Sequence, residues 1–181
     1  DSFDGRPACQ AAWRDAWSAM VYERPTDRAY RRFYLWLHAV VDAAIGQVLD
    51  GLERAGFADD TIVVLTADHG DLLGAHGGLQ QKWHNAFDEA LRVPCLLAGP
   101  GVEPGDVHAP TSHVDLLPTL LGLCGIDADA TLASVAATHT EAHPLVGRDL
   151  SPLVGDRSRT DPDDAVYFMT EDQISVGLRQ R

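Results

Sequence analysis

The chain has 181 residues, of which 14 are Lys or Arg and 27 are Asp or Glu, so its formal net charge is −13. This surplus of negative charge repels a phosphate backbone, and no basic run longer than Arg31-Arg32 offsets it, which argues against nucleic-acid binding. A hydrophobic fraction of 45% predicts a globular fold with a core. The longest stretches without charged residues, such as 116–126, fall short of the roughly 18 apolar residues of a membrane helix, so we expect no membrane partner.

The three cysteines, Cys9, Cys95 and Cys124, are an odd number without Cys-x-x-Cys spacing, so they predict neither a disulfide framework nor a zinc site. This usage is compatible with a cytoplasmic protein, which is the location we expect. The chain opens at Asp1 without an initiator Met or a signal-type apolar segment. We therefore expect that the true N-terminus is missing, and secretion stays open.

The first half of the chain predicts two helices and two strands. Apolar residues recur at steps of three and four over 10–21 and over 26–56, which is the period of amphipathic helices, and Gly56 is the expected stop of the longer one. The apolar, β-branched run 61–66 favours an inner parallel strand that is covered on both faces, with 26–55 packed along one face. A second strand is expected at 93–98. This order of predicted helices and strands is typical of an α/β sheet.

The second half is less regular. A helix is expected to begin with the capping-box spacing of Ser112 and Asp115, or at Asp115 itself, and to end near Gly125. The stretch 128–140 is interpreted as loop with at most one short helix, and 145–153 as a surface crossing. A third strand is expected at 165–170.

The most informative residues are Asp68 and His69, because they directly follow the strand 61–66. Side chains just past the carboxyl end of a strand in an open α/β sheet face the crevice where ligands bind. A carboxylate and an imidazole there can ligate one divalent cation, although two ligands are too few. The nearest further candidates are Asp71, His76 and His84. The alternative is an exposed Asp and His in a tight turn.

Lys82 is the single lysine of the chain and lies fourteen residues after Asp68. An ammonium group beside a metal can hold the anionic oxygens of a sulfate or phosphate ester, or protonate a leaving group. The alternative is an ordinary surface cation.

Seven segments in order resemble the C-terminal portion of the catalytic domain of sulfatases, in the alkaline phosphatase superfamily. They include Asp68-His69-Gly70, Lys82 and Arg92-Val93-Pro94. The segments are 44–50, 61–74, Lys82, 89–94, 98–102, 112–121 and 147–150. The resemblance implies an α/β fold that is part of an alkaline phosphatase-like sandwich, with a central, mostly parallel sheet flanked by helices.

The resemblance also implies a hydrolase of sulfuric ester bonds that acts on a small-molecule sulfate ester. Asp68 and His69 would be ligands of a divalent metal, Lys82 would contact the sulfate and its bridging oxygen, and His84 would help to bind substrate. The Asp-His pair resembles choline-sulfatase and phosphonate monoester hydrolase members, whereas many sulfatases have Asn at the second position. The implied metal is Ca²⁺, with Mn²⁺ as the alternative, and assembly into a homo-oligomer stays open.

The family's nucleophile is not found in this sequence. It is a cysteine converted to formylglycine in a Cys-x-Pro-x-Arg signature, or a serine variant, and none of the three cysteines matches that pattern. We therefore interpret 1–181 as a partial sulfatase-like catalytic domain that lacks its nucleophile-bearing part and is inactive alone. The alternatives are a phosphonate or phosphate ester hydrolase of the same superfamily and a non-catalytic sulfatase-like module.

Overall fold

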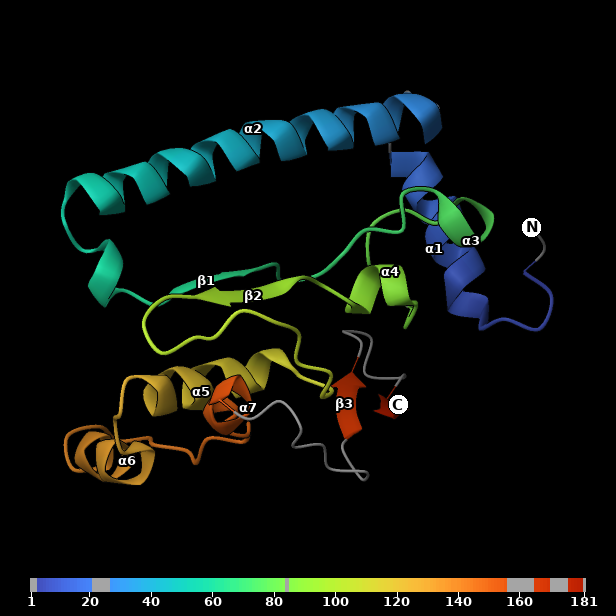
Figure 1. The fold of residues 1–181 in the computed structure, drawn as a ribbon. Coiled ribbons are helices and arrows are strands. Elements are labelled where there is room, and N and C mark those ends of the chain that lie inside the picture. The colour runs from blue at the N-terminus through green and yellow to red at the C-terminus, as the bar shows by residue number, and fades with distance from the viewer. Residues whose placement is uncertain (1–2, 21–26, 84, 156–164, 170–175, 181) are drawn as a thin grey trace. The chain divides into compact units, whose positions relative to one another are not determined.

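The structure is a computed structural model that describes residues 3–20, 27–83, 85–155, 165–169 and 176–180. Its elements divide between two compact units, one formed by Asp1–Pro100 with Met169–Gly177 and the other by Gly101–Phe168 with Leu178–Arg181. The first unit contains the long helix α2 and the strand pair β1–β2, and Figure 1 shows α2 along one side of that pair. Each unit is described separately below.

The first unit begins with the two helices that the apolar periodicity predicts. Helix α1 spans Ala8–Met20 and helix α2 spans Asp27–Arg54. Gly56, with a positive φ of 76°, follows the end of α2, as expected for a glycine that stops a helix. A 3₁₀ turn at Ala58–Asp60 then leads into the first strand.

Strands β1 (Val63–Thr66) and β2 (Cys95–Ala98) confirm the two predicted strands but correct their arrangement. They pair antiparallel, from Val63 opposite Ala98 to Thr66 opposite Cys95. The expected inner parallel strand is therefore not found among the described residues, where β1 has β2 as its neighbour. An apolar run shows that a strand can be covered on both faces, but it does not determine the direction of its partner.

Helix α2 lies along one side of the strand pair, as expected, but it keeps most of its large apolar side chains exposed. Among its large apolar side chains, Trp36 is 58% and Val48 71% exposed. A helix of 28 residues is about 42 Å long, whereas a four-residue strand covers about 13 Å, so the pair is too short to cover it. By length and composition alone, Arg28–Arg54 also meets the requirements of a membrane-crossing helix, as helices in the cores of globular proteins do.

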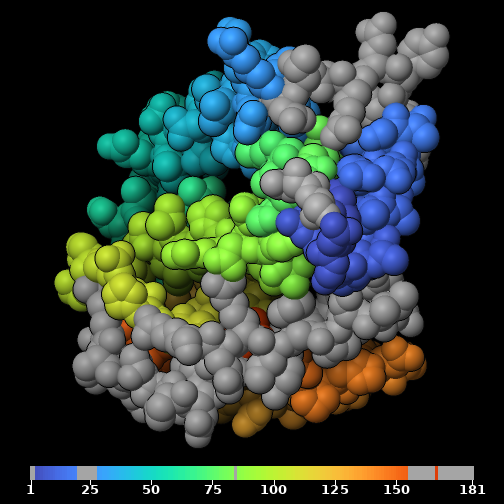
Figure 2. All heavy atoms as spheres, turned by 90° about the vertical axis from the view of Figure 1, so that its right-hand side faces the viewer, coloured from blue at the N-terminus to red at the C-terminus, as the bar shows by residue number. Residues whose placement is uncertain are grey.

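The segment between β1 and β2 contains the small core of the first unit. Leu72, Leu79 and Ala90 are buried together, with Phe3, Trp13 and Phe87 packed against them. Two short helices, α3 (Ala75–Gly78) and α4 (Asp88–Leu91), belong to this segment. Figure 2 shows the N-terminal segment, in blue, packed against these green residues. The loop that follows Asp68 is thus anchored by the core on one side and by α1 on the other.

The second unit is organised around the buried carboxylate of Asp115. Ser112 N and Arg148 N donate to it at 2.9 and 2.8 Å, and the Arg148 guanidinium lies 3.7 Å away. This confirms the predicted capping-box contact and ties 147–150 to the start of a helix. The helices are a 3₁₀ turn at His113–Asp115, α5 (Leu116–Leu123), α6 (Ala128–Ala136) and α7 (Ser151–Gly155).

The third predicted strand is confirmed as β3 (Ala165–Met169), which pairs with β4 (Val176–Gln180). The short helix allowed for within 128–140 is α6. The stretch 145–153, interpreted as a surface crossing, contains the start of α7, whose apolar pattern is too short for a helical period to be read from it.

At Gly70, the loop that follows β1 comes into close contact with the backbone of Glu89, and this contact yields a stability prediction. Its N–H donates to the Ala90 carbonyl at 2.9 Å, and a Cβ at this position would collide with the Glu89 carbonyl. Gly70→Ala should therefore lower the free energy of unfolding by about 1–3 kcal/mol, measured by urea denaturation. Gly46→Ala is the matched control, because open space surrounds Gly46 in α2, and it should raise the free energy by about 0.5–1 kcal/mol. Equal effects of the two substitutions would contradict the close approach.

Candidate active site

Asp68 and His69 lie side by side just after β1, where the sequence analysis predicts a metal site. The Asp68 side chain is 83% exposed and that of His69 is 35% exposed. The His69 backbone N–H donates to Asp68 Oδ1 at 2.9 Å, and His69 Nε2 lies 3.3 Å from Asp68 Oδ2. The loop therefore presents one carboxylate and one imidazole toward the same point.

The hydrogen bonds of the His69 ring fit a metal ligand. Its Nδ1 is 2.8 Å from the Gly70 carbonyl, which only accepts, so Nδ1 carries the proton of the neutral ring and Nε2 keeps its lone pair. Nε2 and Asp68 Oδ2 are then two acceptors 3.3 Å apart. A positive charge is needed between two such atoms, and either a proton or a divalent cation supplies it. The residues present therefore fit a metal, as two of its ligands.

The Asp68 carboxyl has a lowered pKa. The main cause is the hydrogen bond from the His69 N–H, with smaller electrostatic contributions from His69 and Lys82. Lys82, fourteen positions further along the chain, makes the smallest of these contributions. A depressed pKa keeps Asp68 ionised, which is the form that binds a cation.

The Lys82 side chain is half-buried and lies over its neighbour Trp83, with Nζ 5.3 Å from the ring centroid. Trp83 in turn donates from Nε1 to Gln81 Oε1 at 3.1 Å and packs against Trp13 of α1, with 5.8 Å between ring centroids. The ring of Trp83, held by Gln81 and Trp13, is thus the aromatic neighbour of the Lys82 ammonium group.

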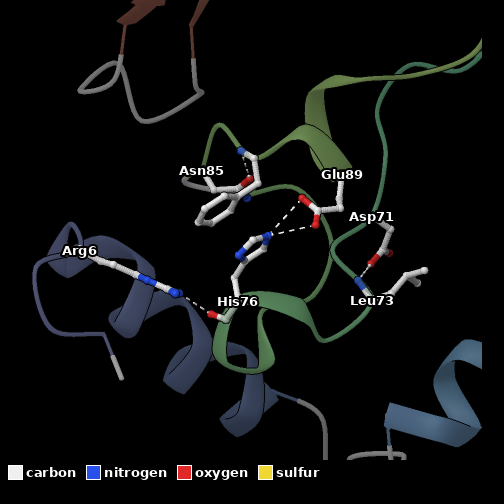
Figure 3. Close-up of polar contacts among 7 residues, drawn as sticks. Arg6, Asp71, Leu73, His76, Asn85 and Glu89 are labelled. Carbon is white, nitrogen blue, oxygen red and sulfur yellow. Dashed lines mark hydrogen bonds and ion pairs between the residues drawn. The ribbon is translucent and has the colours of Figure 1, made fainter. Parts of the chain in front are cut away.

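The structure does not add Asp71 or His76 to the pair, although both were candidates for further ligands. Both Asp71 oxygens accept hydrogen bonds from protein donors, one of them the Leu73 N–H in Figure 3. His76 stacks on Phe87 with 3.7 Å between ring centroids and directs Nε2 to both Glu89 oxygens at 3.1 Å. Within the described ranges no cluster of three His, Cys, Asp or Glu side chains forms. His84, the predicted substrate contact, lies outside the described residues.

The residues that support the loop were not singled out from the sequence. Arg6 donates to the His76 carbonyl at 2.7 Å, and Trp17 Nε1 donates to Gln80 Oε1 at 2.7 Å. The buried Asn85 donates from its amide nitrogen to the Trp83 carbonyl and accepts from the Phe87 N–H at its amide oxygen. The spacing of Trp13 and Trp17 on one face of α1 was a signal for a helix face, but nothing in it identified 80–83 as the partner.

Comparison with known proteins places these residues in a family. A family model described as Sulfatase matches residues 4–126. The choline-sulfatase of Rhizobium meliloti is 36% identical over 138 residues, which cover 75% of this chain and 24% of the relative. Arylsulfatase K of Danio rerio is 38% identical over 100 residues, or 55% of this chain and 19% of that protein. The chain therefore spans about a quarter or less of the length of these curated relatives.

Among solved structures, a phosphonate monoester hydrolase from Silicibacter pomeroyi matches with a TM-score of 0.63 and 32% identity, covering 81% of this chain and 27% of that chain. Choline-sulfatase and phosphonate monoester hydrolase were the two types that the Asp68-His69 pair resembled, so the comparisons confirm the resemblance. They also confirm the expected fold class, because such neighbours have the alkaline phosphatase-like fold.

The pair His76 and Glu89 yields a pH prediction. The pKa of Glu89 is lowered, chiefly by a backbone hydrogen bond and then by the bond to His76. A depressed folded-state pKa contributes stability above the ordinary pKa of Glu, and this contribution is lost as the pH falls through the folded value. Glu89→Gln should therefore lower the urea midpoint at about pH 7 and match the wild type at about pH 3. Glu53→Gln, an exposed glutamate of α2, is the control, and an equal deficit of Glu89→Gln at both pH values would contradict the pairing.

Proposed function

This chain belongs to the sulfatase family, and we propose that its loop 67–83 forms part of the active site of a sulfuric ester hydrolase. Asp68 and His69 bind the divalent cation and Lys82 binds the ester. The observation that supports this most directly is the position of Asp68 and His69 directly after β1, with His69 Nε2 3.3 Å from Asp68 Oδ2. A divalent cation on Asp68 and His69, together with the Lys82 ammonium group, would supply the positive charge that hydrolysis of an anionic ester requires.

The proposed metal is Ca²⁺, with Mn²⁺ as the alternative. A carboxylate suits either hard ion, and the imidazole nitrogen of His69 is better matched to Mn²⁺ than to Ca²⁺. When bound, the cation supplies charge stabilisation at the ester oxygens. Asp68 and His69 orient it, and the Gly70 carbonyl fixes the His69 ring. Two ligands from this chain leave the remainder to residues outside it, because a hard cation takes six to eight.

Lys82 acts on the leaving group. Negative charge grows on the bridging oxygen as its bond to sulfur breaks, so an ammonium group held there stabilises the transition state more than the ground state. Its position over Trp83 limits the freedom of the side chain, which reduces the entropy that is lost when it contacts substrate.

The chain is proposed to be a partial catalytic domain. Its match to about a quarter of the choline-sulfatase chain and the exposed apolar face of α2 both support further domain residues packed around it. The nucleophile would come from that part. We propose that the isolated chain does not turn over substrate and that the substrate of the complete protein is a small-molecule sulfate ester.

We also propose that the protein is cytoplasmic. It is proposed to bind neither nucleic acid nor membrane.

A phosphonate or phosphate ester is the second candidate substrate class. It is favoured by His69, which stands where many sulfatases have Asn, and by the likeness to a phosphonate monoester hydrolase. Both ester classes present anionic oxygens to the same cation and to Lys82. Comparing kcat/KM for a sulfate ester and a phosphonate monoester of the same alcohol in the complete protein distinguishes them.

The proposed role of Lys82 predicts a selective loss. In the complete protein, Lys82→Ala should lower kcat by about 10² for sulfate esters with poor leaving groups, and by less for esters of acidic phenols, which need less help on departure. Lys82→Arg should not fully restore the rate, because a planar guanidinium does not occupy the space of a compact ammonium.

The measurement is kcat/KM across a series of leaving-group pKa values. Arg54→Ala, which removes an exposed cation at the end of α2, is the control and should follow the wild-type line. A line for Lys82→Ala that runs parallel to the wild type would show that Lys82 does not act on the leaving group. A coincident line would show that Lys82 is a surface cation.

A further inference from the structure

The carboxylate of Asp71 connects three separate parts of the first unit. Its Oδ1 accepts from the Leu73 N–H at 2.8 Å and from the Gln81 N–H at 3.1 Å. Its Oδ2 accepts from the Tyr30 hydroxyl of α2 at 2.8 Å. One side chain thus bonds the residues that follow the metal pair, the residue that precedes Lys82 and the long helix.

Backbone bonds close the same loop beside this carboxylate. The Leu72 N–H donates to the Gln81 carbonyl at 3.0 Å, and the Gly74 N–H donates to the Leu79 carbonyl at 2.8 Å. Gln81 has a φ of 60°, a left-handed conformation that costs energy for a residue other than glycine. The bond from its N–H to Asp71 helps to hold that conformation, and Lys82 is the next residue along the chain.

Tyr30 is suited to be a permanent donor in this arrangement. Its pKa is strongly raised, first by burial and then by the hydrogen bond to Asp71. The hydroxyl therefore keeps its proton over the whole range in which hydrolases work, and Asp71 always has a donor on Oδ2. With both oxygens engaged by protein donors, Asp71 is a clamp of the loop rather than a further metal ligand.

We infer that Asp71 is a positioning residue that fixes the Lys82 ammonium group relative to the Asp68–His69 pair, with Tyr30 holding the clamp to α2. The inference rests on the proposed function, because it gives the clamp a role in catalysis. Asp71 does not touch the ester or the metal, and its effect on the reaction passes through Lys82. Loss of the clamp lets 81–82 relax, which moves the ammonium group away from the bridging oxygen.

The clamp itself is tested by amide hydrogen exchange on the 181-residue chain. Asp71→Ala should accelerate exchange of the Gln81 and Leu73 amides by about 10-fold or more, while the amides of β1 keep their rates. Asp60→Ala removes an exposed carboxylate of the same unit and should change neither amide. If the amides of β1 also accelerate, the variant has lost its fold and Tyr30→Phe, which removes one bond only, takes its place. An unchanged Gln81 rate in the folded variant would overturn the clamp.

The action through Lys82 is tested by a double-mutant cycle in the complete protein, with Asp71→Asn, Lys82→Ala and the double variant. Asn has the shape of Asp and keeps one acceptor oxygen. The amide nitrogen that replaces the other oxygen only donates, so it cannot accept the hydrogen bond from the Tyr30 hydroxyl. Asp71→Asn should lower kcat for a poor leaving group by about 10-fold in the wild type and by less than about 2-fold when Lys82 is already Ala. The affinity of the Asp71→Asn variant for Mn²⁺, measured by calorimetry, should match that of the wild type.

The outcomes separate this inference from the function on which it rests. Equal losses from Asp71→Asn with and without Lys82, or a 10-fold weaker affinity for Mn²⁺, would overturn the positioning role and favour a direct one on the metal. If Lys82→Ala alone leaves the rates unchanged, the proposed function fails and the positioning role fails with it. The Gln81 exchange rate then still decides whether Asp71 clamps the loop.

Discussion

The hydrogen bonds of the Asp71 carboxylate are the interaction on which the geometry of the site depends. They draw together the chain before Lys82, the chain after His69 and Tyr30 of α2. Together with the backbone bond from Leu72 to Gln81, they offset the backbone entropy that is lost when the loop closes. A carboxylate serves this purpose well, since its two oxygens can accept several bonds at once and charge strengthens each of them.

Around that carboxylate the first unit uses a very small core. Leu72 and Leu79 are the most deeply buried apolar side chains, and Phe3, Trp13 and Phe87 pack against their cluster. Asp68, the proposed metal ligand, stays exposed beside this core, which is the usual division between a rigid scaffold and a functional loop. The apolar face of α2 is left outside this core.

The sequence predicted the elements and the chemistry better than their arrangement. Apolar periodicity identified α1 and α2, and the position of Asp68 and His69 after a strand was predicted correctly, because both signals are local. The antiparallel pairing of β1 with β2 and the exposure of α2 depend on contacts between distant segments, which no local pattern encodes. Asp71 shows the same limit. Its carboxylate suited a metal ligand by residue type. The proposed role as a clamp of the loop follows only from the donors of Gln81 and Tyr30 around it in the structure.

The central claim is that Asp68 and His69 bind the divalent cation of a sulfatase active site. Pulsed electron paramagnetic resonance of Mn²⁺ bound to the complete protein tests it most directly, because coupling to an imidazole nitrogen reports a histidine ligand. The account predicts a histidine nitrogen coupling that is lost in His69→Ala and kept in His108→Ala, an exposed histidine of the second unit. A His69→Ala spectrum with the same nitrogen couplings as the wild type, or a wild type without any histidine coupling, would contradict it.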